Sequence, residues 1–193
     1  MFARHSQAET PADNVLQANS DTAIMDFSGT EAIPFLTAIL GLDINKLTAS
    51  GLGLRSSLDD DLTSSYAYAL YYFNETAFRF VLGKDASVQL QSLINEQQLR
   101  YDIDYVMRDD LSALTLSGEQ AFDALVDSFK LTPGLRLSDM RSCYGAQSGE
   151  VFITAIDNQA TQQFQLVARR AELDKWQTHL QQLGFDLALA NVA

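Results

Sequence analysis

The sequence predicts an α+β protein made of an internally duplicated pair of subdomains, each an antiparallel sheet with helices against one face. One repeated motif carries this prediction: an apolar strand, a Ser-Gly corner and a helix follow one another at residues 23–40 and again at 112–125. In both predicted helices the apolar residues recur three and four positions apart, which is the period of a helix with one buried face. Strand pairs follow each copy, so the same supersecondary unit is used twice.

Composition and charge narrow the class of protein. The 193 residues are 47% hydrophobic and 20% charged, which is typical of a soluble globular protein of one or two small domains. A formal net charge of -12 makes bare nucleic acid and anionic membranes poor partners, because both attract cations. Cys143 is the only cysteine, which excludes an intrachain disulfide and favours a reducing compartment. Without an apolar run of about 20 residues or a signal-peptide core, the sequence predicts a cytoplasmic protein.

The chain is expected to begin with a flexible arm at residues 1–20, which are polar and show no sustained period around the breaker Thr10-Pro11. The ordered fold is expected to start near Thr22. Its first α+β half is predicted to span residues 21–106 and its second half residues 107–193.

In the first half, hydrophobic periodicity and turn residues define the elements in order. After the first strand and helix, a glycine-rich turn leads into a strand, a hairpin, a second helix and a last strand. The predicted strands cover residues 54–58, 66–73, 77–82 and 99–106, and the second helix covers 85–95 with Val88, Leu90, Leu93 and Ile94 facing inward.

The second half is predicted to repeat this order. A helix at 119–129 is followed by a connection at 131–149 that carries one short strand. Strands at 150–156 and 163–168 then form a hairpin, and a helix containing Trp176 precedes a strand near 183–187. Residues 163–168 match residues 77–82, which extends the repeat beyond the first motif.

Five short motifs occur in a fixed order along residues 14–185. They are Asp26-Phe27-Ser28-Gly29 before a Phe-Leu helix, Asp43-Ile44-Asn45-Lys46-Leu47, Tyr71-Tyr72-Phe73 before Phe78-Arg79-Phe80-Val81, Arg108-Asp109-Asp110-Leu111-Ser112 before Leu116-Ser117-Gly118, and Tyr144-Gly145 before Gly149-Glu150-Val151-Phe152-Ile153. In order and spacing the sequence resembles the aminomethyltransferase family, the T-protein of the glycine cleavage system and its folate-binding relatives. The resemblance implies the fold of the N-terminal two domains of that family, as two subdomains or one continuous folate-binding-like domain.

The resemblance also implies a chemistry, the transfer of an aminomethyl carbon from a lipoyl arm to tetrahydrofolate, which requires an acidic residue near the reactive folate nitrogen. Where the family has Gly-Gly-x-x-Asp-Asp, this sequence has Thr63-Ser64-Ser65-Tyr66-Ala67-Tyr68, so the expected acid falls on Ala67 or Tyr68. Val81-Leu82-Gly83 replaces a Val-Val-Asn run, and Asp157-Asn158-Gln159-Ala160-Thr161 replaces Gly-Tyr-Thr-Gly-Glu. The sequence also stops before the family's C-terminal barrel. The resemblance therefore implies a truncated and degenerate relative that has lost catalysis.

Asp59, Asp60 and Asp61 are the candidates for the missing acid, or for hard oxygen ligands of a cation. Three consecutive acids at a hairpin tip are more often simply solvated, and no metal site is predicted. Tyr66, Tyr68 and Tyr72 are the candidates for stacking on a pterin ring, against the alternative that they are core and cross-strand pairs.

Three further features have a structural interpretation. Arg108-Asp109-Asp110 is predicted to be a charged turn between the halves. Cys143 has no histidine near it in sequence, which argues against a nucleophilic role. Trp176 is predicted to lie in the core, because it stands at helical spacing from Leu173 and Leu180.

Two functions follow from the resemblance. The first is a binding or assembly module in one-carbon metabolism, acting on a lipoylated carrier or another one-carbon enzyme. The second is an active tetrahydrofolate-dependent aminomethyl or one-carbon transferase that a partner subunit completes. The sequence leaves open whether folate binds, which protein is the partner, and what the oligomeric state is.

Overall fold

The computed structural model of the protein describes residues 14–47, 49–59, 64–130, 142–158 and 161–188. Its strands are β1 (Val15–Asn19), β2 (Thr22–Ser28), β3 (Leu52–Ser57), β4 (Ala67–Asn74), β5 (Ala77–Gly83), β6 (Asp104–Met107), β7 (Leu111–Ser117), β8 (Ser142–Ser148), β9 (Val151–Asn158), β10 (Thr161–Arg169) and β11 (Asp186–Leu187). Its helices are α1 (Ala32–Ala38), the 3-10 turn η1 (Ile44–Lys46), α2 (Lys84–Gln97), α3 (Ala121–Phe129) and α4 (Arg170–Gln182). The predicted α+β class is confirmed.

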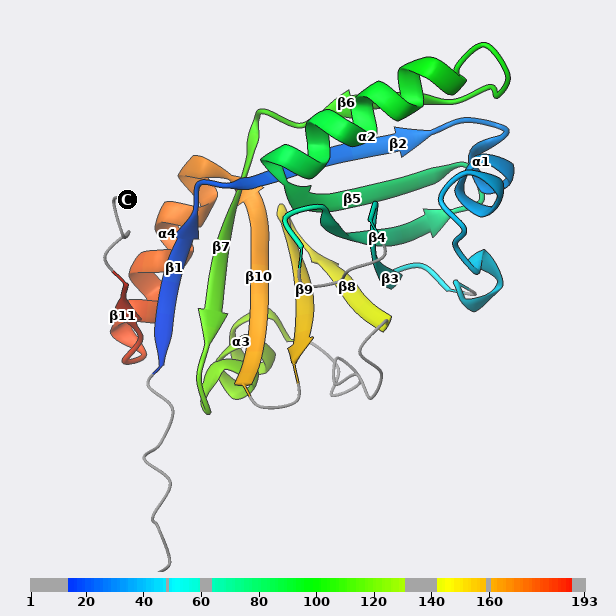
Figure 1. Cartoon of the computed structure of the whole chain (residues 1–193). Helices are drawn as coiled ribbons and strands as arrows, with labels where there is room; N and C mark the ends of the chain where they lie inside the picture. The colour runs from blue at the N-terminus through cyan, green and yellow to red at the C-terminus, as the bar shows by residue number, and fades with distance from the viewer. Residues whose placement is uncertain (1–13, 48, 60–63, 131–141, 159–160, 189–193) are drawn as a thin grey trace, which may run out of the picture.

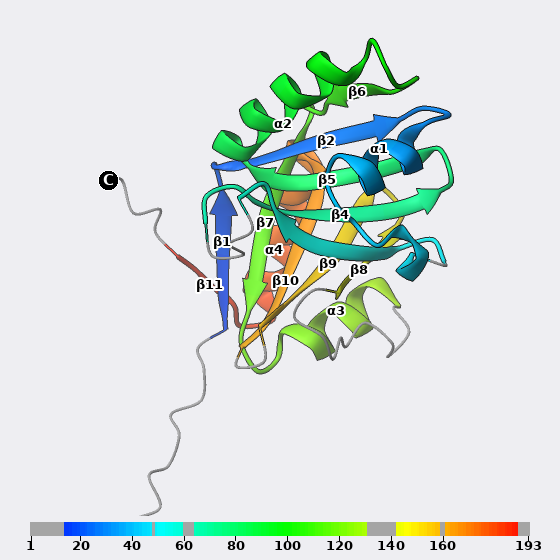
Figure 2. The same cartoon turned by 45° about the vertical axis from the view of Figure 1, so that its right-hand side comes forward.

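The described strands form one eleven-stranded sheet, in the order β11-β1-β7-β10-β9-β8-β3-β4-β5-β2-β6. Neighbouring strands are antiparallel except β1 and β11, which are parallel. The sheet is strongly curled, so that β2, β4 and β5 run across the direction of β7, β9 and β10 (Figures 1 and 2). Sequence periodicity predicted a sheet in each half, and the pairing of β3 with β8 joins the two.

Glycines make the junction between β3 and β8 possible. The Gly145 N–H donates a hydrogen bond of 2.7 Å to the carbonyl oxygen of Gly51, which has a φ of +91°. Gly53 lies opposite Cys143 in the register, and a Cβ at Gly53 would stand 2.6 Å from the Cys143 sulfur. Side chains at these positions would push the two halves of the sheet apart.

The expected N-terminal arm ends earlier than predicted. β1 lies within residues 1–20, and its Leu16 is fully buried in the sheet of the second half, where β1 pairs with β7. Leu16 is the only buried residue of this five-residue strand, so β1 has no alternation that would mark it in a polar stretch. The remainder of the predicted arm, residues 1–13, lies outside the described residues.

Two further details of the first half differ from the prediction. Val88, expected to face inward, is 61% exposed, because the buried face of α2 is set by Ala86, Leu90 and Ile94 at steps of four. Leu99 is 96% exposed in the turn after α2, and the strand predicted from residue 99 starts only at β6. In the second half, the short strand expected within residues 131–149 is the seven-residue β8.

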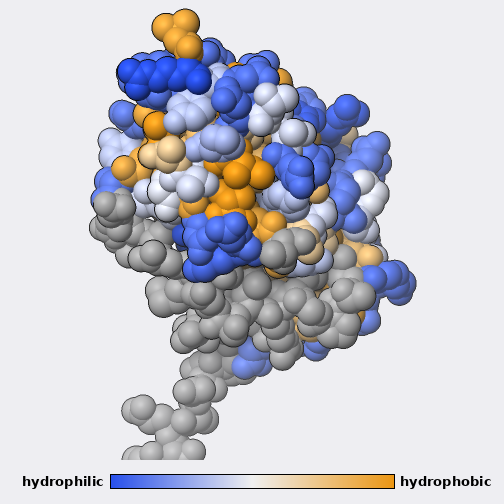
Figure 3. Space-filling model, turned by 90° about the vertical axis from the view of Figure 1, so that its right-hand side faces the viewer, coloured by the Kyte–Doolittle hydropathy of each residue, from blue (hydrophilic) through white to orange (hydrophobic). Residues whose placement is uncertain are grey.

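Three groups of buried side chains make up the core. The first core lies between the first-half strands and the helices α1 and α2, and the second core between the second-half strands and α3 and α4. The inner core, on the opposite face of the sheet, joins Ile24, Tyr71 and Val81 to Ala113, Cys143, Phe152 and Val167, so it contains residues of both halves. On the face that lies to the right in Figure 1, where α1 is found, apolar side chains gather in a central patch surrounded by hydrophilic ones (Figure 3).

Candidate functional site

A small pocket of about 170 Å³ lies beside the inner core, between the two halves of the sheet. Strands β2, β3, β4 and β5 form one side of it, and β9 and β10 contribute Ala155 and Gln165. Among its polar side chains are those of Arg55, Tyr68 and Tyr71. We refer to it as the inner pocket. Because the inner pocket lies between the two halves of the sheet and Ala67 and Tyr68 line it, it is the candidate site for the predicted folate chemistry.

The phenols of the inner pocket are neutral. Burial raises the pKa of Tyr68 to about 12, against a smaller lowering by its hydrogen bond with Ser56. Burial also raises the pKa of Tyr71 well above its usual value. A phenol in this state does not act as a base near neutral pH, because it holds its proton far too tightly.

Cys143, next to Tyr71, is equally unreactive. Burial raises the pKa of its thiol to about 12, although a hydrogen bond with Tyr71 and the charge of Arg55 lower it in part. The thiolate is the nucleophilic form of cysteine, so the structure gives this residue no nucleophilic character. It serves as a small apolar side chain of the inner core.

The inner pocket does not fit a reduced folate as the described residues form it. Ala67 and Tyr68, where the family resemblance places the acid, both line the pocket, and its described lining contains no carboxylate. Its volume also lies below the 300–1,000 Å³ that is typical of small-molecule sites. The acid that would act on the folate nitrogen is therefore missing at the position where the family carries it.

The three predicted tyrosines belong to the first core. The Tyr68 ring is 4% exposed and packs edge-on against Phe80, with 5.4 Å between ring centroids. Tyr72 packs in the same way against Phe78 at 5.6 Å, and Tyr66 is half-buried against the same core. Of the three, only Tyr68 lines the inner pocket. The structure does not gather them around one cavity, and their cofactor-binding role stays a prediction.

Of the three predicted acids at the hairpin tip, Asp59, Asp60 and Asp61, the structure describes only Asp59. The carboxylate of Asp59 accepts hydrogen bonds from the hydroxyls of Ser57 and Ser64, the latter at 2.8 Å. Asp60 and Asp61 lie outside the described residues. Across the described part of the chain, no three His, Cys, Asp or Glu side chains are close enough together to hold a metal ion.

Sequence reasoning missed an ion cluster at the junction of the halves. Asp26 of β2 accepts hydrogen bonds from Arg79 Nε at 2.6 Å and from Arg108 Nη1 at 2.6 Å. Arg108 also donates two hydrogen bonds to Asp110, at 2.8 and 2.9 Å. The guanidinium carbon of Arg79 lies 5.4 Å from the ring centroids of both Phe73 and Phe152. The sequence contained a sign of this cluster, because Asp26 and Arg79 are charged residues that each interrupt an apolar strand.

The cluster fixes the charge of its carboxylates. Burial raises the pKa of Asp26, but the hydrogen bonds from Arg79 and Arg108 outweigh it, so the net shift is downward. The hydrogen bond from Arg108 is the main reason that the pKa of Asp110 falls to about 2. Both carboxylate oxygens of Asp26 already accept hydrogen bonds from guanidinium groups. Asp26 is therefore a poor proton donor or acceptor for a substrate.

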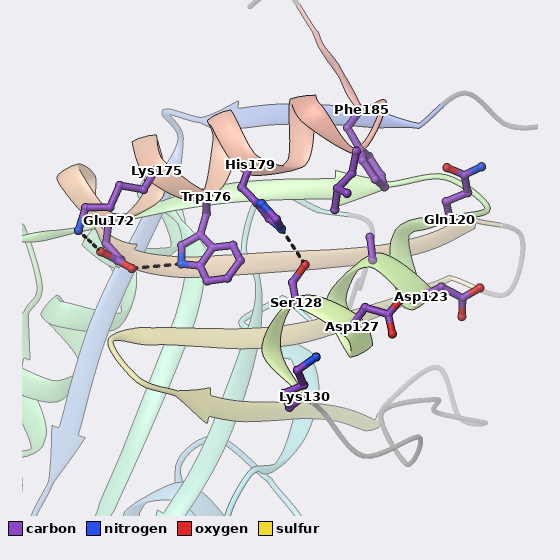
Figure 4. Close-up of a pocket in the computed structure, with 12 residues that line it drawn as sticks. Gln120, Asp123, Asp127, Ser128, Lys130, Glu172, Lys175, Trp176, His179 and Phe185 are labelled. Atoms are coloured by element: carbon purple, nitrogen blue, oxygen red, sulfur yellow. Dashed lines mark hydrogen bonds and ion pairs between the residues drawn. The ribbon is translucent and has the colours of Figure 1, made fainter.

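A larger groove of about 890 Å³ runs between α3 and α4 (Figure 4). Trp176 of α4 stacks on Phe129 of α3 with 3.9 Å between ring centroids, and its indole N–H donates to Glu172 at 3.2 Å. His179 and Ser128 point toward each other across the groove, with 3.2 Å between Nε2 and Oγ. Trp176 packs against the second core as predicted, yet it is only half-buried and lines this groove.

No helix among the described residues is long and apolar enough to cross a membrane.

Comparison with known proteins supports the fold. No protein-family model matches the chain. The structure of the glycine cleavage system aminomethyltransferase T from Bartonella henselae matches with a TM-score of 0.70 and 20% identity, covering 93% of this chain and 48% of that one. Heterotetrameric sarcosine oxidase from Corynebacterium sp. U-96, in complex with pyrrole 2-carboxylate, matches with a TM-score of 0.61 and 12% identity, covering 92% of this chain and 88% of the other. The chain spans about half the length of the aminomethyltransferase and is close in length to the matched oxidase chain. Likeness at these identities shows the fold alone, and that fold is T-protein-like.

Proposed function

We propose that this protein is a non-catalytic subunit with a T-protein-like fold, acting as a binding and assembly module for an enzyme of one-carbon metabolism. The observation that carries the proposal is the inner pocket, where Ala67 and Tyr68 replace the acid that aminomethyl transfer requires. The same sequence of elements, strand-helix-three strands-helix, runs from β2 to α2 and from β7 to α4, which supports an origin by internal duplication.

The inner pocket offers no substitute for the missing acid. A general acid or base works best with a pKa near the operating pH, and the phenols of Tyr68 and Tyr71 lie far above it. Asp26, an acid in one of the family-like motifs, is held by two arginines. The described residues therefore favour a structural subunit over a transferase.

A role within an assembly is supported by the matched structures and by charge. The oxidase whose chain resembles this one in length is heterotetrameric, and the aminomethyltransferase belongs to a cleavage system. A formal charge of -12 suits a partner with a basic surface. The partner classes we propose are a one-carbon enzyme and a lipoylated carrier.

One observation favours a second candidate function. Arg55 and Gln165 give the inner pocket a cation and an amide, which are groups that can hold the carboxylate of a folate tail. If a partner subunit supplied an acid beside them, the complex would act as a tetrahydrofolate-dependent one-carbon transferase. The tyrosines Tyr66, Tyr68 and Tyr72 and the acids Asp59, Asp60 and Asp61 would then be the residues to test.

A titration of the purified protein with tetrahydrofolate separates the two candidates. We expect no heat of binding by calorimetry and no change in Tm, because the inner pocket is small and its described lining contains no acid. Stabilisation that grows with ligand concentration, as mass action requires, and that is lost in Arg55→Gln, would support the second candidate. Asp60→Ala serves as the control for a contribution of the acidic tip.

Purification of the tagged protein from its source cells tests the assembly role. We expect a stoichiometric complex with a second kind of chain, stable through size-exclusion chromatography. A protein that elutes alone under these conditions, at concentrations far above the Kd expected of a stable complex, would contradict the proposal.

A further inference from the structure

In the first half, a phenylalanine stands at the position that corresponds to a small residue in the groove between α3 and α4. Each half places a helix directly after a Ser-Gly corner, so Phe35 of α1 and Ala124 of α3 occupy the same position relative to Gly29 and Gly118. Phe35 is fully buried, whereas Ala124 is half-buried and lines the groove.

In the first half, the Phe35 ring fills the space between its helix and the turn after the second helix. Its centroid lies 5.4 Å from that of Phe27 and 5.9 Å from that of Tyr101. Phe185 follows α4 as Tyr101 follows α2, and it is 2% exposed at the base of the groove. The second half thus keeps an aromatic residue at the position of Tyr101 and has the small Ala124 at the position of Phe35.

The walls of the groove define what could fill it. Its exposed apolar surface comes from Ala124, Trp176 and Leu183, of which Leu183 is 45% exposed. Glu172 and Lys175 neutralise each other through a contact of 2.8 Å.

The remaining charges of the groove are predominantly acidic. Asp123 and Asp127 lie one helical turn apart, are exposed, and form no ion pair with any described residue. Lys130 is the one cation near them that is likewise unpaired within the described chain. A filling group should therefore be apolar or aromatic and should carry positive charge beside it.

We propose that this groove is the docking site for a segment of a partner subunit. The segment inserts an aromatic or large aliphatic side chain against Ala124 and Trp176 and places a Lys or Arg beside Asp123 and Asp127. This inference rests on the proposed function as a subunit, and it identifies the surface through which the subunit would bind its partner. A second copy of this acidic chain is a poor occupant, because docking would bring two bodies of charge -12 together.

Site-specific photocrosslinking in the purified native complex tests where the partner lies. Benzoylphenylalanine is placed at position 128, on the wall of the groove, or at position 88, where α2 is exposed on the other half. We expect position 128 to crosslink to a partner segment that contains an aromatic or large aliphatic residue and a Lys or Arg, and position 88 not to crosslink to that segment. Crosslinks from position 128 only to a second copy of this chain or to its own residues would overturn the inference, and so would none at all.

Filling the groove provides the complementary test. Ala124→Phe restores the ring that Phe35 supplies in the first half, so we expect an unchanged or higher Tm and a loss of at least about tenfold in partner affinity, equal to about 1.4 kcal/mol. Val88→Phe, on an exposed position of α2, is the matched control and should leave affinity unchanged. Should Ala124→Phe fail to fold, the double variant Asp123→Lys, Asp127→Lys alters only exposed side chains and should weaken the complex as well.

The possible results distinguish a failure of the docking inference from a failure of the proposed function as a subunit. If the wild-type complex exists and survives both variants, the docking inference is wrong while the subunit role stands. If the wild-type protein forms no complex, the proposed function fails and the docking inference fails with it.

Discussion

Asp26 shows how one residue can connect elements that are far apart in the sequence. Its two carboxylate oxygens are shared between Arg79 on the neighbouring strand β5 and Arg108 at the turn into the second half. Arg79 is only 12% exposed, and its guanidinium carbon lies 5.4 Å from the ring centroids of Phe73 and Phe152, so its charge requires a partner. Removing the carboxylate would leave that cation largely dehydrated and unpaired.

We therefore predict that Asp26→Asn lowers the free energy of unfolding by about 1–3 kcal/mol, the range for losing hydrogen bonds to charged groups. Urea denaturation followed by circular dichroism measures it. The control is Asp43→Asn, which removes an exposed contact of 3.9 Å with Lys46 and should cost no more than about 0.5 kcal/mol. Equal effects of the two substitutions would show that the cluster contributes no more than a surface pair.

The same cluster predicts how stability depends on pH. The folded pKa of Asp26 is lowered, so folding favours its ionised form, and the resulting stability is fully present above the unfolded pKa of about 4. This stability is lost as the pH falls through the folded value. The difference in unfolding free energy between wild type and Asp26→Asn should accordingly be constant near neutral pH and shrink below about pH 4. A difference that persists unchanged into strong acid would contradict this.

The ion cluster and the buried tyrosines also show how far residues can be interpreted from sequence. Alternation along residues 66–73 allowed Tyr68 and Tyr72 to be either core or ligand contacts, because both roles need the same spacing. In the structure Tyr68 packs against Phe80 and Tyr72 against Phe78, while their role as ligand contacts stays a prediction. Arg108 was predicted to lie in a charged turn, and its reach to Asp26 depends on strand pairing that no local pattern specifies.

At the scale of elements, the junction of β3 and β8 depends on close backbone approach. We predict that Gly53→Ala destabilises the protein by about 1–3 kcal/mol, because the added Cβ would lie 2.6 Å from the Cys143 sulfur and 2.7 Å from the Leu70 carbonyl oxygen. Gly83→Ala is the matched control, since its nearest neighbour, the carbonyl oxygen of Ser65, would be 3.3 Å away. Thermal and urea unfolding of both variants measure the difference, and a cost for Gly83→Ala as large as for Gly53→Ala would contradict the argument.

Elements with a strong period were predicted with close bounds, whereas β8 was predicted only as one short strand within residues 131–149. The hairpin β4–β5 and the helices α2 and α3 follow the apolar alternation and the three-four spacing of their sequences. β8, with the sequence Ser-Cys-Tyr-Gly-Ala-Gln-Ser, has no clear alternation and is a strand because it pairs with β3 on one side and β9 on the other. The groove between α3 and α4 was missed for a similar reason, since its lining comes from residues of two helices that only tertiary packing brings together.

At the scale of the whole molecule, the sequence predicted two halves and the structure joins them in three ways. One sheet runs through both halves by way of β3 and β8, β1 lies in the sheet of the second half, and the inner core draws residues from each. Arg108 adds an ionic link close to the predicted boundary at residues 106 and 107. Separate unfolding of either half would expose the inner core and break the ladder between β3 and β8.

We therefore predict that the halves unfold together, as a single cooperative unit. Trp176 is the only tryptophan and lies in the second half, so its fluorescence reports on that half alone. Hydrogen exchange of amides in α2 reports on the first half, and far-ultraviolet circular dichroism reports on both. The three urea midpoints should coincide, and Gly53→Ala should shift all of them equally because it acts at the shared junction. A fluorescence midpoint distinct from that of α2 would instead establish residues 21–106 and 107–193 as independent domains, in which case Gly53→Ala would destabilise mainly the first.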